Sequence, residues 1–177
     1  HKEYRRQRQM CIRDRIYTSS FGFAALKEDG SVVTWGESGN GIARRFGNNI
    51  IEICSTDTTF AALTANGGII SWGGGISSTY TEVASSGAVK IYSNTYAFAA
   101  IKNDGSVITW GNRNTGGAVD EATSLKLKSD VIEITSTDSG FAARKKDGSV
   151  VTWGIWGGDS SGVAENLQSG VIKAVSY

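Results

Sequence analysis

The stretch FAALKEDGSVVTWG, residues 23–36, decides the fold, because variants of it recur along the 177-residue chain. The other copies are FAALTANGGIISWG at residues 60–73, FAAIKNDGSVITWG at 98–111 and FAARKKDGSVVTWG at 141–154. In every copy a Phe is followed 12 residues later by a Trp, and then by a Gly. A fixed spacing of this kind indicates a repeat protein, in which a small unit is stacked several times because one unit cannot bury its own apolar face.

Each copy contains two apolar segments that flank a short polar turn. The turn dipeptides are Asp29 and Gly30, Asn66 and Gly67, Asp104 and Gly105, and Asp147 and Gly148. Both residue types accept the positive φ angles of tight hairpins, so the pattern predicts a β-hairpin in every copy. The aspartates could instead be ligands or catalytic carboxylates. The second copy has Asn at this position with unchanged spacing, which favours turn chemistry.

Another apolar segment precedes each Phe, with an Ile seven residues before it: Ile16, Ile53, Ile91 and Ile134. The clearest examples are IIEICS at residues 50–55, AVKIYS at 88–93 and VIEITS at 131–136. Their β-branched residues and the alternation of apolar and charged positions predict a half-buried strand. Each repeat therefore holds at least three antiparallel strands, the middle one apolar on both faces. We predict an all-β fold with repeats at residues 16–49, 50–87, 88–130 and 131–170, and with residues 171–177 as the start of a fifth.

The recurring aromatic residues are predicted to form the structural core. These are Phe23, Trp35, Phe60, Trp72, Phe98, Trp110, Phe141 and Trp153. Burying each aromatic side chain contributes roughly 1.5–3 kcal/mol, so the four pairs would be the main apolar row of the fold. An alternative is that the Trp residues are exposed platforms that stack on sugars or grip peptides.

The length of the repeat varies only between each Trp and the next first strand. From each Trp to the Ile that lies seven residues before the next Phe, the distance is 18, 19 and 24 residues, and it is 21 from Trp153 to Ala174. Insertions collect in loops on one face of a repeat protein, and such loops carry binding residues. The candidate partner-binding residues are Arg44, Arg45, Arg113, Asn114 and Trp156. Apolar pairs four residues apart in these stretches fit either a helical turn or a short outer strand. The alternative to a binding role is that these are solvated loops without a function, which would show the same variation between repeats.

Composition narrows the functional classes. The chain is 40% hydrophobic and 20% charged, with 23 Gly, no Pro and a net charge of +1. This balance predicts no nucleic-acid or membrane partner, and no apolar run is long enough for a membrane-spanning helix. The basic leader, residues 1–15, shares nothing with the repeats and is treated as artefactual or disordered, with a basic binding arm as the alternative. Cys54 has no counterpart in the other repeats and is predicted to be a free, partly buried thiol.

The pattern of an apolar strand, then FAAL or FAAI, then DGSVxTWG resembles the regulator of chromosome condensation repeat, whose units form the blades of a β-propeller. The resemblance covers residues 16–177 and implies about four blades of three to four antiparallel strands. The repeats run 37, 38 and 43 residues from Phe to Phe, shorter than is usual for that family, and lack its second glycine-rich segment. Propellers have typically four to eight blades, so we expect an incomplete propeller, with a four-blade ring closed by residues 171–177 as the alternative.

The sequence contains no residue pattern that predicts catalytic activity. The one histidine is His1 in the leader, and there is no zinc-ligand spacing, Ser-His-Asp set or phosphate-binding loop. We predict a scaffold without enzyme activity, metal, cofactor or small-molecule substrate, which binds a protein through its variable loops. The family resemblance implies an alternative, guanine-nucleotide exchange on a small GTPase, although no segment matches an exchange-catalysing insertion. Exposed aromatic residues such as Tyr80, Tyr96 or Trp156 would suit a third possibility, glycan binding.

Overall fold

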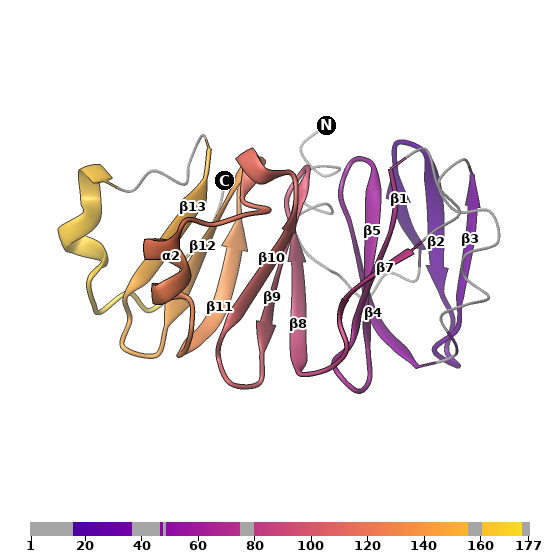
Figure 1. Cartoon of the computed structure of the whole chain (residues 1–177), viewed down its shortest axis with the longest axis horizontal. Coiled ribbons are helices and arrows are strands. Elements are labelled where there is room, and N and C mark those ends of the chain that lie inside the picture. The colour runs from indigo at the N-terminus through magenta and orange to yellow at the C-terminus, as the bar shows by residue number, and fades with distance from the viewer. Residues whose placement is uncertain (1–15, 37–46, 48, 75–79, 156–160, 175–177) are drawn as a thin grey trace. The chain divides into compact units, whose positions relative to one another are not determined.

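The computed structural model describes residues 16–36, 47, 49–74, 80–155 and 161–174 (Figure 1). It contains four antiparallel β-sheets, one for each repeat, and only short helices. The prediction of an all-β repeat fold with three to four strands per repeat is therefore confirmed. The chain forms two compact units, residues 1–91 and 92–177.

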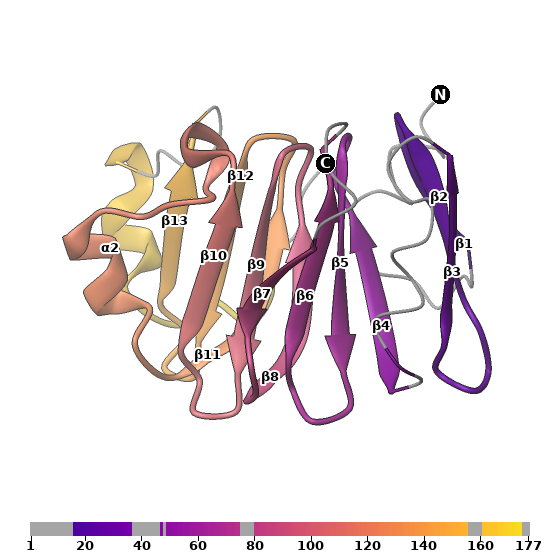
Figure 2. The same cartoon turned by 45° about the vertical axis from the view of Figure 1, so that its right-hand side comes forward.

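The N-terminal unit contains the first two sheets. The strands of the first are β1 (Ile16–Ser19), β2 (Gly22–Leu26) and β3 (Val32–Gly36), and those of the second are β4 (Ile50–Ser55), β5 (Thr59–Thr64), β6 (Ile69–Gly73) and β7 (Tyr80–Ala84). In both sheets the strands lie side by side in chain order. Figure 2 shows β7 as the outer strand beside β6.

The third and fourth sheets follow the same plan with three strands each. The elements are β8 (Ala88–Ser93), β9 (Ala97–Lys102), β10 (Val107–Gly111), the 3₁₀ helix η2 (Arg113–Thr115), α2 (Glu121–Lys126), β11 (Val131–Ser136), β12 (Gly140–Lys145), β13 (Val150–Gly154) and the 3₁₀ helix η3 (Ser161–Leu167). The predicted first strands at residues 50–55, 88–93 and 131–136 coincide with β4, β8 and β11. The middle strands β5 and β9 are buried along almost their whole length, as expected for strands that are apolar on both faces.

The 12-residue spacing from Phe to Trp has a simple geometric meaning. In β2 and β3, Phe23 lies directly opposite Trp35 across the hairpin, and the other three repeats have the same register. The two rings of each pair are stacked, with centroids 5.2–5.4 Å apart. Aromatic cross-strand pairs of this kind stabilise a hairpin beyond the apolar area they bury.

Burial differs between the four pairs: the second and fourth are buried, the third has a buried Phe98 and a half-buried Trp110, and the first is exposed. Phe60, Phe98 and Phe141 are at most 2% exposed, whereas Phe23 and Trp35 are 42% and 40% exposed. The core prediction is therefore wrong for the first pair. Phe60 and Trp72 are buried because they share a cluster with Ala24 and Val32 of the preceding sheet. Within the described residues, the buried clusters do not include Phe23 or Trp35.

The turn glycines connect one repeat to the next. Gly30, Gly67, Gly105 and Gly148 all have φ between 78° and 81°. Each glycine carbonyl accepts a hydrogen bond from the first residue of the next strand segment: Ile50 N to Gly30 O at 3.0 Å, Ala88 N to Gly67 O at 2.9 Å, Val131 N to Gly105 O at 3.1 Å and Val171 N to Gly148 O at 3.0 Å. The hairpin turn is therefore also the place where adjacent repeats join.

The C-terminal segment keeps this junction without forming a strand. Residues 171–174 have no regular secondary structure, but Val171 makes the same hydrogen bond as Ile50, Ala88 and Val131. The hydroxyl of Thr135 in β11 also donates to the carbonyl of Ala174 at 3.2 Å. This segment therefore makes the same junction as the first strands of the second, third and fourth repeats, and residues 175–177 lie outside the described part of the chain.

Two other expectations are resolved by the fold. Cys54 is 2% exposed and disulfide-bonded, so the prediction of a free, partly buried thiol is wrong; Cys11 lies outside the described residues.

The variable stretch takes a different form in each repeat where it is described: β7 in the second, η2 and α2 in the third, and η3 in the fourth. Both an outer strand and a helical turn therefore occur in this one chain.

Glu52 in β4 is a half-buried carboxylate with an unusual environment. It faces Leu63 across the strand pair, whereas the corresponding Glu133 of β11 faces Arg144, whose Nε lies 3.0 Å from its Oε2. Burial raises the pKa of Glu52 to about 7, although the charge of Lys90 and a backbone hydrogen bond from Ile91 oppose this shift.

We expect Glu52 to make stability depend on pH between about 4.5 and about 7. In this window the folded protein binds more protons than the unfolded chain, so the free energy of unfolding falls as the pH rises. Urea denaturation across the window should show this slope in the parent protein and a much weaker one in Glu52→Gln. The exposed Glu121→Gln variant should keep the slope. An unchanged slope in Glu52→Gln would assign the pH dependence to another group.

Candidate functional site

The variable stretch of the third repeat is the best described of the predicted binding loops. It follows β10 and comprises η2, α2 and their connections, residues 112–130. Arg113 and Asn114 lie in η2 and are both exposed. Of the other predicted loop residues, Arg44, Arg45 and Trp156 lie outside the described part of the chain.

Side-chain caps fix the path of this loop. The Asn112 side chain begins η2 by accepting a hydrogen bond from Asn114 N at 2.9 Å. The Asp120 carboxylate begins α2 by accepting from Thr123 N at 2.7 Å, and this hydrogen bond is the main cause of its lowered pKa. Short polar residues at these positions satisfy N–H groups that the helix leaves unpaired. Leu127, which follows α2, is 2% exposed and anchors the end of the loop in the core.

The repeat core positions the loop directly. The indole Nε1 of Trp153 donates to the carbonyl of Gly116 at 3.1 Å. A Cβ atom at Gly116 would lie 2.8 Å from the Phe141 ring, so the loop backbone packs against the aromatic pair. Only glycine permits this approach, and Gly116 also has a φ of 98°. The same Phe and Trp that hold the hairpin together therefore hold the loop.

Asn94 ties the loop to the turn between β8 and β9. This residue is 4% exposed, and its Nδ2 donates to Thr115 O at 2.6 Å. Its Oδ1 accepts hydrogen bonds from Tyr96 N and Ala97 N, which close the turn between β8 and β9. Thr56 occupies the corresponding turn position in the second repeat and accepts from Thr59 N at 3.0 Å. The hydrogen bond from Asn94 to Thr115 O is therefore an additional contact, made by the amide group that asparagine has and threonine lacks.

We expect Asn94→Thr to loosen the loop while keeping the turn. The threonine hydroxyl can replace the turn-closing acceptor, as it does at Thr56, but cannot reach Thr115 O. Loss of one buried hydrogen bond should cost about 1–2 kcal/mol. Hydrogen–deuterium exchange should become faster at residues 112–117 than elsewhere, and Asn94→Ala should be more damaging because it also breaks the turn. Unchanged protection of residues 112–117 in Asn94→Thr would contradict this role.

The loop encloses one side of a polar depression of about 350 Å³ in the C-terminal unit. Arg113, Asn114, Asp120 and Thr123 line it from the loop, and Thr152 and Trp153 line it from β13. An exposed guanidinium, an amide and a carboxylate thus lie around a mainly polar depression. A small number of placed polar groups can fix the orientation of a bound side chain or short peptide segment.

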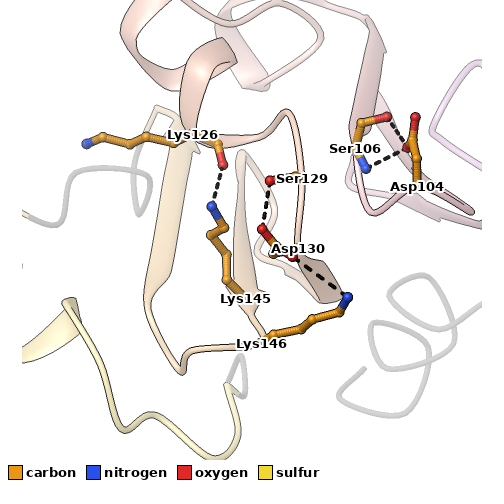
Figure 3. A network of polar contacts seen from close by, with 7 residues as sticks. All are labelled: Asp104, Ser106, Lys126, Ser129, Asp130, Lys145 and Lys146. Carbon is orange, nitrogen blue, oxygen red and sulfur yellow. Dashed lines mark hydrogen bonds and ion pairs between the residues drawn. The ribbon is translucent and has the colours of Figure 1, made fainter.

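The predicted turn residues lie away from this depression. In three turns the aspartate Oδ1 accepts hydrogen bonds from both the backbone N–H and the hydroxyl of the serine two residues later, as for Asp104 with Ser106 (Figure 3). These bonds lower the pKa of Asp29, Asp104 and Asp147, each of which is exposed to solvent. Their carboxylates are therefore occupied by turn contacts.

Metal-ligating clusters and membrane-spanning helices are absent from the described part of the chain. No three His, Cys, Asp or Glu side chains within it lie close enough to hold a metal ion. None of its helices is long and apolar enough to cross a membrane. Of the aromatic residues considered for glycan binding, Tyr96 is 48% exposed in the turn before β9. The side chains of Tyr80 and Trp156 lie outside the described residues.

Comparison with known proteins shows that this chain resembles several solved structures in its fold. No family model matches the chain, and no curated protein matches it. Among solved structures, the chain is similar to Prp20p from Saccharomyces cerevisiae, also called yeast RCC1, with a TM-score of 0.60 and 21% identity over 79% of this chain. The fold is an RCC1-like β-propeller repeat.

Two further structures resemble this chain in fold. Human WBSCR16 matches with a TM-score of 0.56 and 17% identity over 82% of this chain, and the CRINKLY WD40 ectodomain of the Arabidopsis thaliana receptor kinase ACR4 with a TM-score of 0.52 and 18% identity over 80%. The matches cover 44% of Prp20p, 49% of WBSCR16 and 56% of the ACR4 ectodomain. The chain therefore spans about half the length of these structures and corresponds to an incomplete propeller.

Proposed function

We propose that this chain is a non-catalytic propeller scaffold that binds a protein partner through the loops after its third strands. The observation that carries the proposal is the loop at residues 112–130. Its backbone is held by Asn94 and Trp153, while Arg113 and Asn114 remain exposed beside the depression. A loop that is already ordered loses little conformational freedom on binding, which favours affinity.

The structural neighbours are consistent with such a role. The structure of Prp20p was described together with its binding to Gsp1p and histones, and yeast RCC1 was also solved bound to Kap60. These partners belong to those proteins. For this chain they support only the coarser proposal that an RCC1-like scaffold serves protein recognition, since fold alone does not determine function.

The test begins by identifying the partner from the loop itself. A photo-crosslinking amino acid at Asn114 should capture a protein that the same amino acid at the hairpin residue Glu28 does not. With that protein purified, Arg113→Glu should weaken binding by roughly tenfold or more in calorimetric titration, because it reverses a charge at the centre of the site. Equal capture at both positions, or an unchanged affinity of Arg113→Glu, would reject the loop as the binding surface.

Guanine-nucleotide exchange on a small GTPase is a second candidate, favoured by the fold similarity to the Gsp1p-binding Prp20p. The chain should then accelerate release of a fluorescent guanine nucleotide from a small GTPase. Acceleration that Arg113→Glu abolishes would favour exchange through this loop. No acceleration, with partner binding retained, would favour the scaffold.

A further inference from the structure

One end of the C-terminal unit carries a surface that the loop site does not use. Four segments form it: the hairpin turns at residues 102–106 and 145–149, and the starts of the next strand segments at 126–132 and 170–173. Backbone hydrogen bonds join them, from Val131 N to Gly105 O at 3.1 Å, from Lys146 N to Asp130 O at 2.9 Å and from Val171 N to Gly148 O at 3.0 Å. We call this the turn-end surface, and Figure 3 shows part of it.

Positive charge is concentrated on the turn-end surface. Its basic residues are Lys102, Lys126, Lys128, Lys145, Lys146 and Lys173, and its acidic residues are Asp104, Asp130 and Asp147. Its net charge is therefore +3. The whole chain has 18 basic and 17 acidic residues, of which the leader holds 6 and 2, so the repeats carry 12 and 15 and a net charge of −3. The surface is thus a basic patch on a repeat domain that is otherwise acidic.

The aspartates of this surface are occupied by local contacts. Asp104 and Asp147 accept hydrogen bonds from Ser106 and Ser149 in their turns. Asp130 accepts from the Ser129 hydroxyl at 2.7 Å and lies 3.7 Å from the Lys146 ammonium (Figure 3).

Part of this positive charge is not paired with a carboxylate. Lys145 donates to the backbone carbonyl of Lys126 at 3.1 Å, and its charge also acts on Asp147 in the same turn. Lys128 and Lys173 are exposed and form no ion pair with another described residue. The patch therefore presents ammonium groups that a carboxylate-rich partner can approach.

Exposed apolar side chains lie between these lysines. Ile132 is 44% exposed and Ile172 is 90% exposed, and each directly follows the valine that donates to a turn glycine. At Ile132 the pairing of β11 with β12 shifts register between Val131 and Glu133, which leaves the isoleucine outside the ladder. The surface thus combines isolated aliphatic side chains with positive charge.

We propose that the turn-end surface binds an acidic protein segment that carries apolar side chains among its carboxylates. Nucleic acid fits less well for two reasons. The three aspartates would lie among the phosphates, and the four segments contain no arginine or aromatic residue for base contact or stacking. This second binding surface does not depend on the loop at residues 112–130.

The probe for the test is a fluorescein-labelled synthetic peptide of alternating Glu and Leu, followed by fluorescence anisotropy. Binding to the full chain should be measurable at about 0.05 M NaCl and should weaken strongly at about 0.3 M, because salt screens exposed charges. Lys128→Glu should weaken binding several-fold, and Lys126→Glu with Lys128→Glu by roughly tenfold or more. Lys27→Glu is the matched control, since it changes the net charge by the same amount as Lys128→Glu at a turn in the N-terminal unit.

Three results would overturn the proposal: no binding of the peptide at low salt, equal weakening by Lys27→Glu and Lys128→Glu, or tighter binding of a DNA duplex with the same lysine dependence. Circular dichroism melting of each variant establishes that the fold is intact. Arg113→Glu should leave peptide affinity unchanged. A failure of the loop site and a failure of the turn-end surface are thereby distinguished.

Discussion

Replacing Phe60 with alanine is expected to lower the free energy of unfolding by about 3–5 kcal/mol. The side chain is fully buried, and its ring stacks on Trp72 with centroids 5.4 Å apart. It also packs in a buried cluster with Ile53 and Trp72, so its truncation would leave an enclosed cavity. Equilibrium unfolding in urea, monitored by tryptophan fluorescence and circular dichroism, measures the loss.

Phe23→Ala is the matched control for this experiment. Phe23 has the same cross-strand register and stacks on its Trp at a similar centroid distance of 5.2 Å, but it is 42% exposed. Its truncation removes less buried surface and leaves no enclosed cavity, so we expect a loss of about 1–2 kcal/mol. Equal losses in Phe23→Ala and Phe60→Ala would mean that the first aromatic pair is covered in solution, and would contradict its exposure in the structure.

The second large effect is expected at Gly154, which follows Trp153 at the end of β13. Its φ is 104°, and a Cβ atom there would lie 2.5 Å from Ser139 O and 2.6 Å from Gly140 Cα. Gly154→Ala must therefore move backbone as well as adopt a strained conformation, which should cost about 3 kcal/mol or more. The glycines after Trp35, Trp72 and Trp110 have similarly positive φ and equally close neighbours, which accounts for the recurring Trp-Gly.

Two other glycines separate the causes of this loss. Gly170 has a φ of 77° but open space around its Cβ position, so Gly170→Ala should cost about 1–2 kcal/mol from conformation alone. Gly162 has neither a positive φ nor a close neighbour, and Gly162→Ala should change stability by less than about 0.5 kcal/mol. Thermal unfolding of the three variants should rank them in this order. A Gly154→Ala variant as mild as Gly170→Ala would show that the backbone contact relaxes freely.

The hairpin was predictable from sequence because its determinants are local. Asp-Gly or Asn-Gly fixes the turn, and a 12-residue spacing places Phe opposite Trp. Exposure of Phe23 and Trp35 was not predictable from their own repeat, since residues 23–36 are almost identical to 141–154, where the pair is buried. Burial is decided by the neighbouring sheet, which a local pattern does not contain.

The candidate site was only partly predictable for the same reason. Arg113 and Asn114 stood out because they lie in a stretch that varies between repeats. The roles of Asn94 and Gly116 were missed, because both act through contacts with distant segments. A signal for Asn94 existed, since the corresponding positions hold Thr56 and Thr137. The charge clustering of the turn-end surface was also hidden, because its lysines are spread over residues 102–173.

The hydrogen bond that each turn glycine carbonyl accepts from the next segment of the chain has a consequence for how the chain folds. Every sheet is built from strands that are consecutive in the sequence. The glycine carbonyl of its hairpin turn then accepts a hydrogen bond from the segment that leaves the ribosome next. Contacts that are local in the chain form quickly, since little loop-closure entropy must be lost before they are made. A completed hairpin can therefore template its successor during synthesis. Nascent chains arrested after successive repeats should gain protease resistance in steps, one repeat at a time.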